Sequence, residues 1–124
     1  ETAVQWYRLA ADQGYAYAQG NLGFMYAEGR GVAQDYETAV KWYRLAAGQG
    51  ILSAQYNLGW MYGNGYGAQK DYVRAHMWFN IAASRGALTA SKNRDIIVKR
   101  MTDSQVEAAQ KLQNECAAKK YKEC

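Results

Sequence analysis

Apolar residues recur with helical spacing between residues 52 and 64 of the chain. Ala54, Leu58 and Met61-Tyr62 fall at i, i+4 and i+7 or i+8, which places them on one face of a helix. The helix is predicted to end at Asn64-Gly65, because glycine readily adopts the left-handed conformation that closes a helix.

A second amphipathic helix is predicted from 71 to 85. Asp71 stands where an N-cap side chain accepts hydrogen bonds from the first free amides of a helix. The apolar stripe that follows consists of Tyr72, Ala75, Phe79 and Ala82-Ala83. Gly86 ends this helix, so the two segments are expected to form an antiparallel hairpin.

The same pattern recurs along the chain with a period of about 36 residues. Ala-Val-Gln-Trp-Tyr-Arg-Leu-Ala-Ala at 3–11 returns as Ala-Val-Lys-Trp-Tyr-Arg-Leu-Ala-Ala at 39–47, and more loosely at 75–83. A fixed period in this range predicts a stacked solenoid. The helices are expected near 1–13, 16–28, 35–49, 52–64, 71–85, 87–100 and 102–118.

We therefore predict a single all-α domain over residues 1–124, an α-solenoid of antiparallel helix pairs with a C-terminal capping helix. The expected units are a partial repeat at about 1–14, repeats at 15–50 and 51–86, a partial repeat at 87–101 and a C-terminal cap at 102–124. Thr102 and Gln105 form a capping-box sequence at the start of the capping helix.

Glycines stand in the middle of two of these helices, at Gly23 and Gly59. Glycine there costs about 1 kcal/mol relative to alanine, so we expect it to allow close approach of an aromatic ring on the next helix. The third unit departs from this pattern, with Arg94 and Asp95 in place of a Leu-Gly pair. A charged residue cannot hold the same close approach, which indicates that the array of repeats ends there.

The spacing that recurs between the repeats is Ala-x-x-x-Leu-Gly-x-x-Tyr, then Gly-x-Gly, then Asp-x-x-x-Ala-x-x-Trp-Tyr/Phe-x-x-Ala-Ala-x-x-Gly. It resembles the Sel-1-like repeat, a relative of the tetratricopeptide repeat, over residues 1 to about 93. The resemblance implies a right-handed superhelix and a non-enzymatic adaptor that mediates protein–protein contacts. In bacteria such proteins are often exported, and the near-identical repeats and the Cys-bearing C-terminal end of this chain are those expected of a bacterial protein.

In superhelices of this kind the first helix of each pair lines the concave face, where we expect a protein or peptide partner. Spacings of i, i+4, i+7 and i+11 place one stripe of residues on that face. The stripe comprises Tyr17, Asn21, Phe24 and Glu28, then Ser53, Asn57, Trp60 and Asn64, and then Thr89, Asn93, Ile96 and Arg100.

Asparagine recurs in this stripe at 21, 57 and 93, and its side chain both donates and accepts hydrogen bonds. In the related tetratricopeptide family an asparagine at this place pairs with a peptide backbone, and the resemblance implies that role here. Phe24 and Trp60 would supply the aromatic anchors that dominate interfaces. The alternative is that the asparagines brace neighbouring helices and that Trp60 packs internally.

Composition excludes some classes of partner. The formal net charge is +4, and the excess lies in residues 91–124, with eight Lys/Arg against five Asp/Glu. Nucleic-acid binding usually requires a more continuous basic face, so no nucleic-acid partner is expected. No apolar run approaches the roughly 18–20 residues of a membrane helix, so no membrane insertion is expected.

The two cysteines, Cys116 and Cys124, both lie near the C-terminus. On one continuous helix they would be about 12 Å apart, too far to bond. If the helix stops near 118–120 and the tail folds back, a disulfide can hold this end in place. That pairing predicts a periplasmic or otherwise exported protein, and two free thiols in a cytoplasmic protein are the alternative.

Catalytic and metal-binding motifs are absent from the sequence. His76, the single histidine, has no motif that supplies a nucleophile and an orienting partner, so we expect a structural or surface residue. No zinc-ligand spacing and no phosphate-binding glycine loop occurs, and no metal or cofactor is expected.

Two other functions remain open. Cys-rich relatives of the repeat family suggest a β-lactamase-like or cell-wall-acting hydrolase, but this chain lacks their cysteine pair in every repeat and a Ser-x-x-Lys element. A structural spacer without a specific ligand is the other alternative.

The chain opens at Glu1-Thr2-Ala3, already inside a repeat, and is expected to be a fragment or processed form of a longer protein. Val4, Tyr7 and Ala11 are expected to face a missing preceding helix. An apolar end of this kind predicts self-association through the N-terminal helix.

Overall fold

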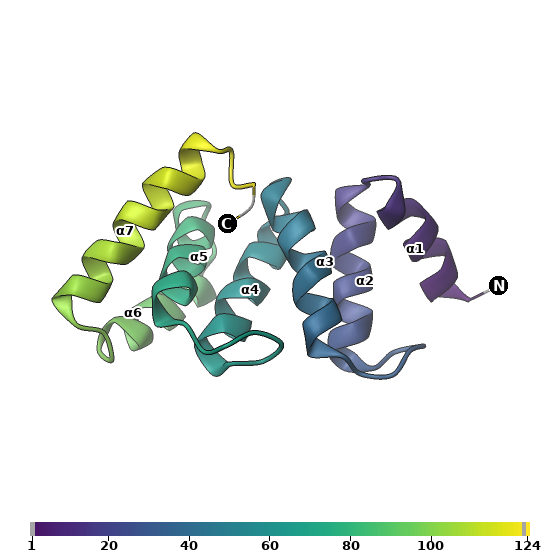
Figure 1. Ribbon diagram of the computed structural model, residues 1–124, viewed down its shortest axis with the longest axis horizontal. Coiled ribbons are helices and arrows are strands. Elements are labelled where there is room, and N and C mark those ends of the chain that lie inside the picture. The colour runs from purple at the N-terminus through teal and green to yellow at the C-terminus, as the bar shows by residue number, and fades with distance from the viewer. Residues whose placement is uncertain (1, 123) are drawn as a thin grey trace.

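The protein is described by a computed structural model that covers residues 2–122 and 124. Seven α-helices and no strand occur in the described residues, which confirms the prediction of an all-α solenoid. Helices α1 to α5 follow one another side by side in chain order, and α6 and α7 both pack against α5 (Figure 1). Their bounds are α1 Ala3–Asp12, α2 Ala16–Glu28, α3 Tyr36–Gly48, α4 Leu52–Asn64, α5 Tyr72–Ser84, α6 Leu88–Val98 and α7 Asp103–Ala118.

The predicted helix ends are confirmed. The side chains of Asp35 and Asp71 accept hydrogen bonds from the backbone amides of the first turns of α3 and α5. Two hydrogen bonds from Thr38, from its hydroxyl and its backbone amide, hold the pKa of Asp35 below its usual value. Gly65 ends α4 with φ of 72° in the left-handed region.

Each of the mid-helix glycines allows an aromatic ring of the next helix to lie against the backbone. A Cβ added to Gly23 would lie 3.0 Å from the ring of Tyr43, and one added to Gly59 would lie 2.7 Å from the ring of Phe79. Leu22 and Leu58, the residues before these glycines, have no exposed surface. The close approach expected from the sequence is therefore confirmed in both repeats.

Buried glutamines add a repeated hydrogen bond that the sequence analysis did not identify. The amide nitrogen of Gln19 donates to the carbonyl oxygen of Ala11, and that of Gln55 donates to the carbonyl oxygen of Ala47, each at 3.2 Å. Each bond ties the first helix of one hairpin to the C-terminal end of the helix before it. Each glutamine thereby adds a second donor to a carbonyl that already accepts a backbone amide, from Gly14 or from Gly50, at the helix end.

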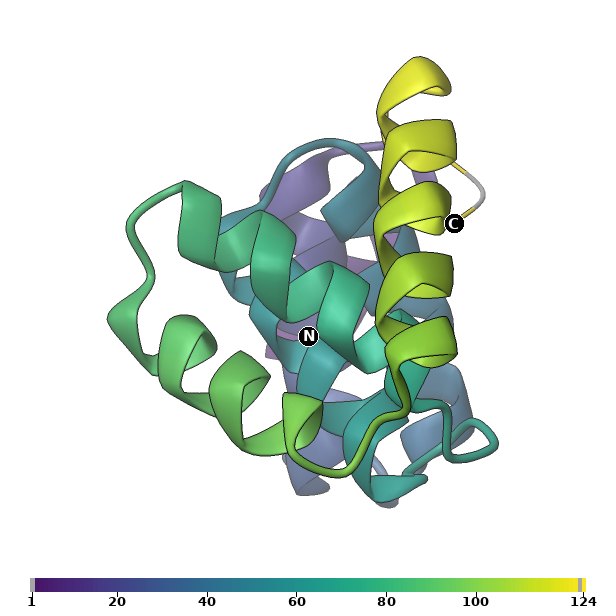
Figure 2. The ribbon, with the colours of Figure 1, turned by 90° about the vertical axis from the view of Figure 1, so that its left-hand side faces the viewer.

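The array ends at α5, which has α6 on one side and α7 on the other (Figure 2). Trp78 and Ile81 of α5 are 1% and 3% exposed. Thr102 and Gln105 form the predicted capping box at the start of α7. The seventh helix thus covers the last apolar face, as expected of a cap.

The tail turns back after α7 through Lys120 and Tyr121, both with positive φ. Cys116 and Cys124 form a disulfide, with their Cα atoms 5.9 Å apart. The pairing agrees with the tail folding back that the sequence analysis required for a bond.

The expectation for the N-terminal helix is wrong in its residues. Val4 and Ala11 are 6% and 2% exposed, because α1 packs this side against α2 within the chain. The exposed apolar residues of α1 are instead Trp6 and Leu9, at 62% and 54%. The helical stripe was assigned to the wrong side of the helix.

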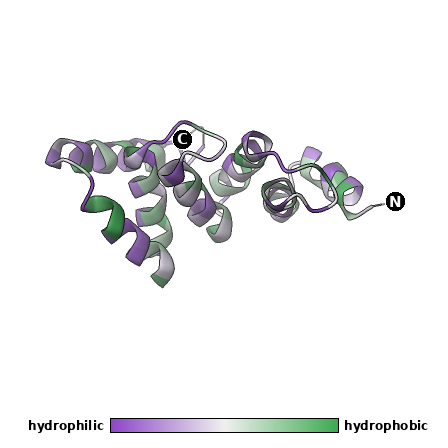
Figure 3. Cartoon of the chain, turned by 90° about the horizontal axis from the view of Figure 1, so that it is seen from below, coloured by the Kyte–Doolittle hydropathy of each residue, from purple (hydrophilic) through white to green (hydrophobic). Residues whose placement is uncertain are grey.

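Hydrophobic and hydrophilic residues are interspersed along the helices, as amphipathic packing requires (Figure 3). In the described part of the chain, each helix is too short or too polar to cross a membrane.

Candidate binding groove

The predicted stripe lies on the surface formed by α2, α4 and α6, which we call the groove face. Phe24 on α2 and Trp60 on α4 are 41% and 40% exposed. Both rings are therefore accessible, and the alternative in which Trp60 is fully packed inside the protein does not hold.

Two cavities lie along the groove face and meet at Trp60. The first has a volume of about 260 Å³ and lies between α2 and α4. The second has a volume of about 290 Å³ and lies between α4 and α6. The predicted residues in the first cavity are Phe24, Glu28, Asn57 and Trp60, and those in the second are Trp60, Asn64, Asn93, Ile96 and Arg100.

Other members of the stripe lie outside these two cavities. Tyr17 is 77% exposed, and it and Asn21 line neither cavity. Ser53 and Thr89 line a separate depression with Leu88 between the N-terminal ends of α4 and α6. The two cavities thus contain the stripe residues that lie toward the C-terminal ends of the helices.

The three asparagines differ in their hydrogen bonds. The amide nitrogen of Asn93 donates to the hydroxyl of Tyr56 at 3.0 Å, whereas Asn57 lines the first cavity together with Tyr43. Asn21 is exposed. Asn93 therefore braces a tyrosine, while an amide retains further donor and acceptor capacity for a ligand.

Asn64 also has a bond within its own helix. Its amide nitrogen donates to the carbonyl oxygen of Trp60 at 2.8 Å. This bond holds the Asn64 side chain beside the tryptophan at the junction of the two cavities.

Two groove residues were missed by the sequence analysis. Tyr36 and Tyr66 stack with ring centroids 5.1 Å apart, and Tyr66 also packs on Trp60 at 5.0 Å. They come from the start of α3 and from the loop between α4 and α5, and so lie outside the first helices that carry the stripe. For Tyr36 the available signal was the aromatic residue that follows each capping aspartate, at 36 and 72, whereas the position equivalent to Tyr66 in the preceding repeat is Arg30.

Burial and a nearby charge determine the protonation state of Tyr43 in the first cavity. Burial raises the pKa of Tyr43 to about 12, the carboxylate of Glu28 adds to the rise, and the hydrogen bond with Asn57 opposes it. Tyr43 therefore stays a neutral hydroxyl at any physiological pH. Glu28 is the charged side chain among the residues that line this cavity.

The second cavity has the opposite charge. Arg100 is the charged side chain among its lining residues. A hydrogen bond from Arg100, followed by one from Lys70, lowers the pKa of Tyr72 at the edge of this cavity. The groove face thus has an acidic end near α2 and a basic end near α6.

His76 does not take part in the groove. It is 8% exposed on α5, and its Nδ1 has no hydrogen-bond partner among the described residues. Burial lowers the pKa of His76, and the positive charge of Arg94 adds to the effect. The structural interpretation of this histidine therefore applies, and not the surface one.

A scan against protein families matches the Sel1 repeat at residues 1–15, 16–51 and 52–86. A comparison with curated proteins finds no match. Among solved structures, c5321, a protective antigen present in uropathogenic Escherichia coli strains and displaying an SLR fold, matches 96% of this chain at 38% identity with a TM-score of 0.89. The match spans 27% of the length of that antigen.

A Sel1 repeat protein from Oxalobacter formigenes also matches. The match covers 75% of this chain and 70% of that protein, at 44% identity and a TM-score of 0.71.

Proposed function

The chain belongs to the Sel1 repeat family, and on this premise we propose that it is a non-enzymatic scaffold that binds an extended segment of a partner protein along the groove face. Sel1 repeats generally serve as scaffolds for protein–protein interaction. The specific adaptor role and the choice of face are the proposal.

The observation that supports this choice is the pair of cavities that share Trp60. An extended peptide rises about 3.3 Å per residue, so a short segment passes from one cavity to the next across the indole ring. Exposed aromatic residues of this kind are the usual anchors of an interface. The amides of Asn57 and Asn93 lie where they can pair with the peptide backbone.

Selection of a displayed peptide library on the immobilised chain, followed by calorimetry of the selected peptides, tests the proposal. Changing Asn57 and Trp60 together to alanine should abolish binding and leave the helical content intact. Trp6→Ala is the matched control, because Trp6 is also exposed but lies on α1, away from the groove face. Binding that survives the double substitution contradicts the assignment.

The hydrolase alternative has no observation in its favour among the described residues. A nitrocefin assay of the purified chain tests it, and turnover that a conventional β-lactamase inhibitor blocks would replace the scaffold proposal.

We also propose that the protein is exported to an oxidising compartment such as a bacterial periplasm. The support is the disulfide between Cys116 and Cys124. Intact mass of the protein from its native source, without reductant, should be two hydrogens below the reduced mass. Two free thiols would favour the cytoplasmic alternative.

Self-association through α1 is a further proposal, now supported by Trp6 and Leu9 instead of the residues first named. Sedimentation at increasing concentration tests it, with Trp6→Glu expected to give a monomer throughout. A wild-type chain that stays monomeric at high concentration contradicts it.

A further inference from the structure

A larger cavity lies away from the groove face, between α3, α5 and the C-terminal tail. Its volume is about 520 Å³, compared with about 260 and 290 Å³ for the groove cavities. We call it the tail pocket, and its lining residues are Lys41, Arg44, Leu45, Arg74, Trp78 and Cys124. These residues come from three separate segments, so no single motif in the sequence points to the pocket.

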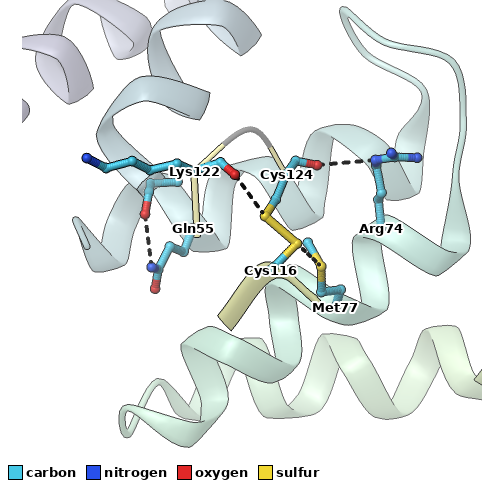
Figure 4. The surroundings of a disulfide bond; sticks show 7 residues. Gln55, Arg74, Met77, Cys116, Lys122 and Cys124 are labelled. Atoms are coloured by element: carbon cyan, nitrogen blue, oxygen red, sulfur yellow. Dashed lines mark hydrogen bonds between the residues drawn. A yellow bond between two sulfur atoms is a disulfide. The ribbon is translucent and has the colours of Figure 1, made fainter. Parts of the chain in front are cut away.

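The folded-back tail forms one wall of the tail pocket. Arg74 Nε donates to the backbone oxygen of Cys124 at 3.3 Å, and Cys116 Sγ lies 3.5 Å from Met77 Sδ (Figure 4). The tail also reaches α3, because a Cβ added to Gly48 would lie 3.1 Å from the carbonyl oxygen of Tyr121. The disulfide holds this wall in place by joining Cys124 to the end of α7.

Three cations line the tail pocket, and two of them, Lys41 and Arg44, have no ion-pair partner among the described residues. The hydroxyl of Tyr62 accepts hydrogen bonds from Nε and Nη2 of Arg44 at 3.0 and 2.6 Å, which fixes this guanidinium without neutralising it. Arg74 forms an ion pair with Asp71 at 3.0 Å. In the described part of the chain, neither Lys41 nor Arg44 has a carboxylate within ion-pair distance.

The tail pocket also presents apolar surface. Leu45 is 52% exposed at its edge. The indole of Trp78 is 1% exposed, and its Nε1 has no hydrogen-bond partner among the described residues. A ligand that fits this surface therefore combines an apolar side chain with anionic groups.

The preceding repeat shows that these cations are not a general property of the solenoid. The positions equivalent to Lys41 and Arg74 are Gln5 and Thr38, which are uncharged, while Arg8 is equivalent to Arg44. Arg8 donates to the hydroxyl of Tyr26 as Arg44 does to that of Tyr62. The three cations of the tail pocket thus have one counterpart, Arg8, in the preceding repeat.

We infer that the tail pocket binds an acidic peptide segment of a partner protein, with an apolar side chain seated between its carboxylates. Carboxylates pair with Lys41 and Arg44, and charge-assisted hydrogen bonds of this kind are stronger than neutral ones. The apolar side chain packs on Leu45 at the edge of the pocket. The site is separate from the groove face and requires the closed disulfide.

Fluorescence anisotropy with a labelled peptide of alternating glutamate and leucine tests this inference. Lys41→Glu combined with Arg44→Ala is expected to weaken binding by about tenfold or more. Arg8→Ala is the matched control, because it removes the same type of arginine–tyrosine bond one repeat earlier and should change binding less than about twofold. Lys119→Glu controls for net charge, and Trp60→Ala controls for binding in the groove.

Opening the disulfide provides the second arm. Reduction of the wild-type chain should lower its affinity for the peptide by about fivefold, and so should the Cys116→Ser, Cys124→Ser double substitution. Circular dichroism should show unchanged helicity in both cases. Glu123, which precedes Cys124 in the sequence, lies outside the described residues. Its change to glutamine should leave peptide binding equal or tighter.

Four results overturn the inference. The first three are equal losses from Arg8→Ala and the Lys41/Arg44 variant, equal binding of a peptide with lysine in place of glutamate, and binding to anionic phosphatidylglycerol vesicles with none to the peptide. Loss of peptide binding in Trp60→Ala but not in the Lys41/Arg44 variant assigns the peptide to the groove and also overturns it.

Discussion

Equivalent positions of two successive repeats, Leu58-Gly59 on α4 and Arg94-Asp95 on α6, use different physical chemistry. Against α4, the ring of Phe79 lies on the bare backbone of Gly59, and Leu58 has no exposed surface. Against α6, the equivalent positions are Arg94 and Asp95, whose side chains are 28% and 66% exposed. The first contact is dry and close, whereas the second is polar and partly hydrated.

The polar contact has its own bonds. Arg94 Nη1 donates to Asn80 Oδ1 at 2.9 Å, and the Asn80 amide donates to Gln113 Oε1 of α7 at 2.7 Å. These bonds link α6 to α7 through α5 and so connect the last partial repeat to the cap. An array of repeats thus ends where its close-packing residues are exchanged for charged ones.

The largest expected effect comes from the leucine that has no exposed surface. Leu58→Ala should lower the free energy of unfolding by about 3 kcal/mol, because it leaves a cavity in the dry contact. Arg94→Ala, at the equivalent position, should cost only about 1 kcal/mol. Urea denaturation of both variants measures the difference, and equal losses would show that the two contacts are alike.

The disulfide should affect the polar end and leave the repeats intact. Cys116 and Cys124 are eight residues apart in sequence. Their bond is expected to add about 2–3 kcal/mol to the free energy of unfolding, because it lowers the conformational entropy of the unfolded chain. Hydrogen exchange after reduction should accelerate at the end of α7 and stay unchanged in α2 and α4. Uniform acceleration throughout the chain would contradict a local role.

Glycine at the close contact is tested by adding a single methyl group. Gly59→Ala should destabilise by about 1–2 kcal/mol, because the clash with Phe79 exceeds the gain in helix propensity. Asp95→Ala, at the equivalent and exposed position, should change stability by less than about 0.5 kcal/mol. If Gly59→Ala instead raises the free energy of unfolding, the ring of Phe79 can move aside and the close contact is not rigid.

The smallest expected effect is a pH dependence that arises from His76. Because burial lowers its pKa below the ordinary 6.5, the unfolded chain binds a proton that the folded chain does not. Stability should therefore fall as the pH decreases through 6.5 and be fully present above it. His76→Phe should flatten this slope in thermal melts between about pH 7.5 and 5.5, and an unchanged slope would assign it to other groups.

The sequence predicted the architecture because its signals are local and repeated. Gly23 and Gly59, the capping aspartates Asp35 and Asp71, and the Thr102 capping box each act within a helix or with its nearest neighbour. The side of α1 that is buried could not be read in the same way, because Val4 and Trp6 are both apolar and only packing selects between them.

The groove was predicted less completely than the helices. Phe24, Asn57 and Trp60 were found from their spacing on first helices. Tyr66 was missed because its ring comes from a loop, whose path a helical period does not specify. The tail pocket depends on a tail whose folded-back position is set by long-range contacts with Gly48 and Arg74.

The four tryptophan indole N–H signals offer the most direct test of the groove. In a nitrogen–proton NMR titration with a library-selected peptide, the account predicts that the Trp60 signal shifts while those of Trp6 and Trp42 stay in place. A titration that moves the Trp6 or Trp42 signal and leaves Trp60 unchanged would contradict it.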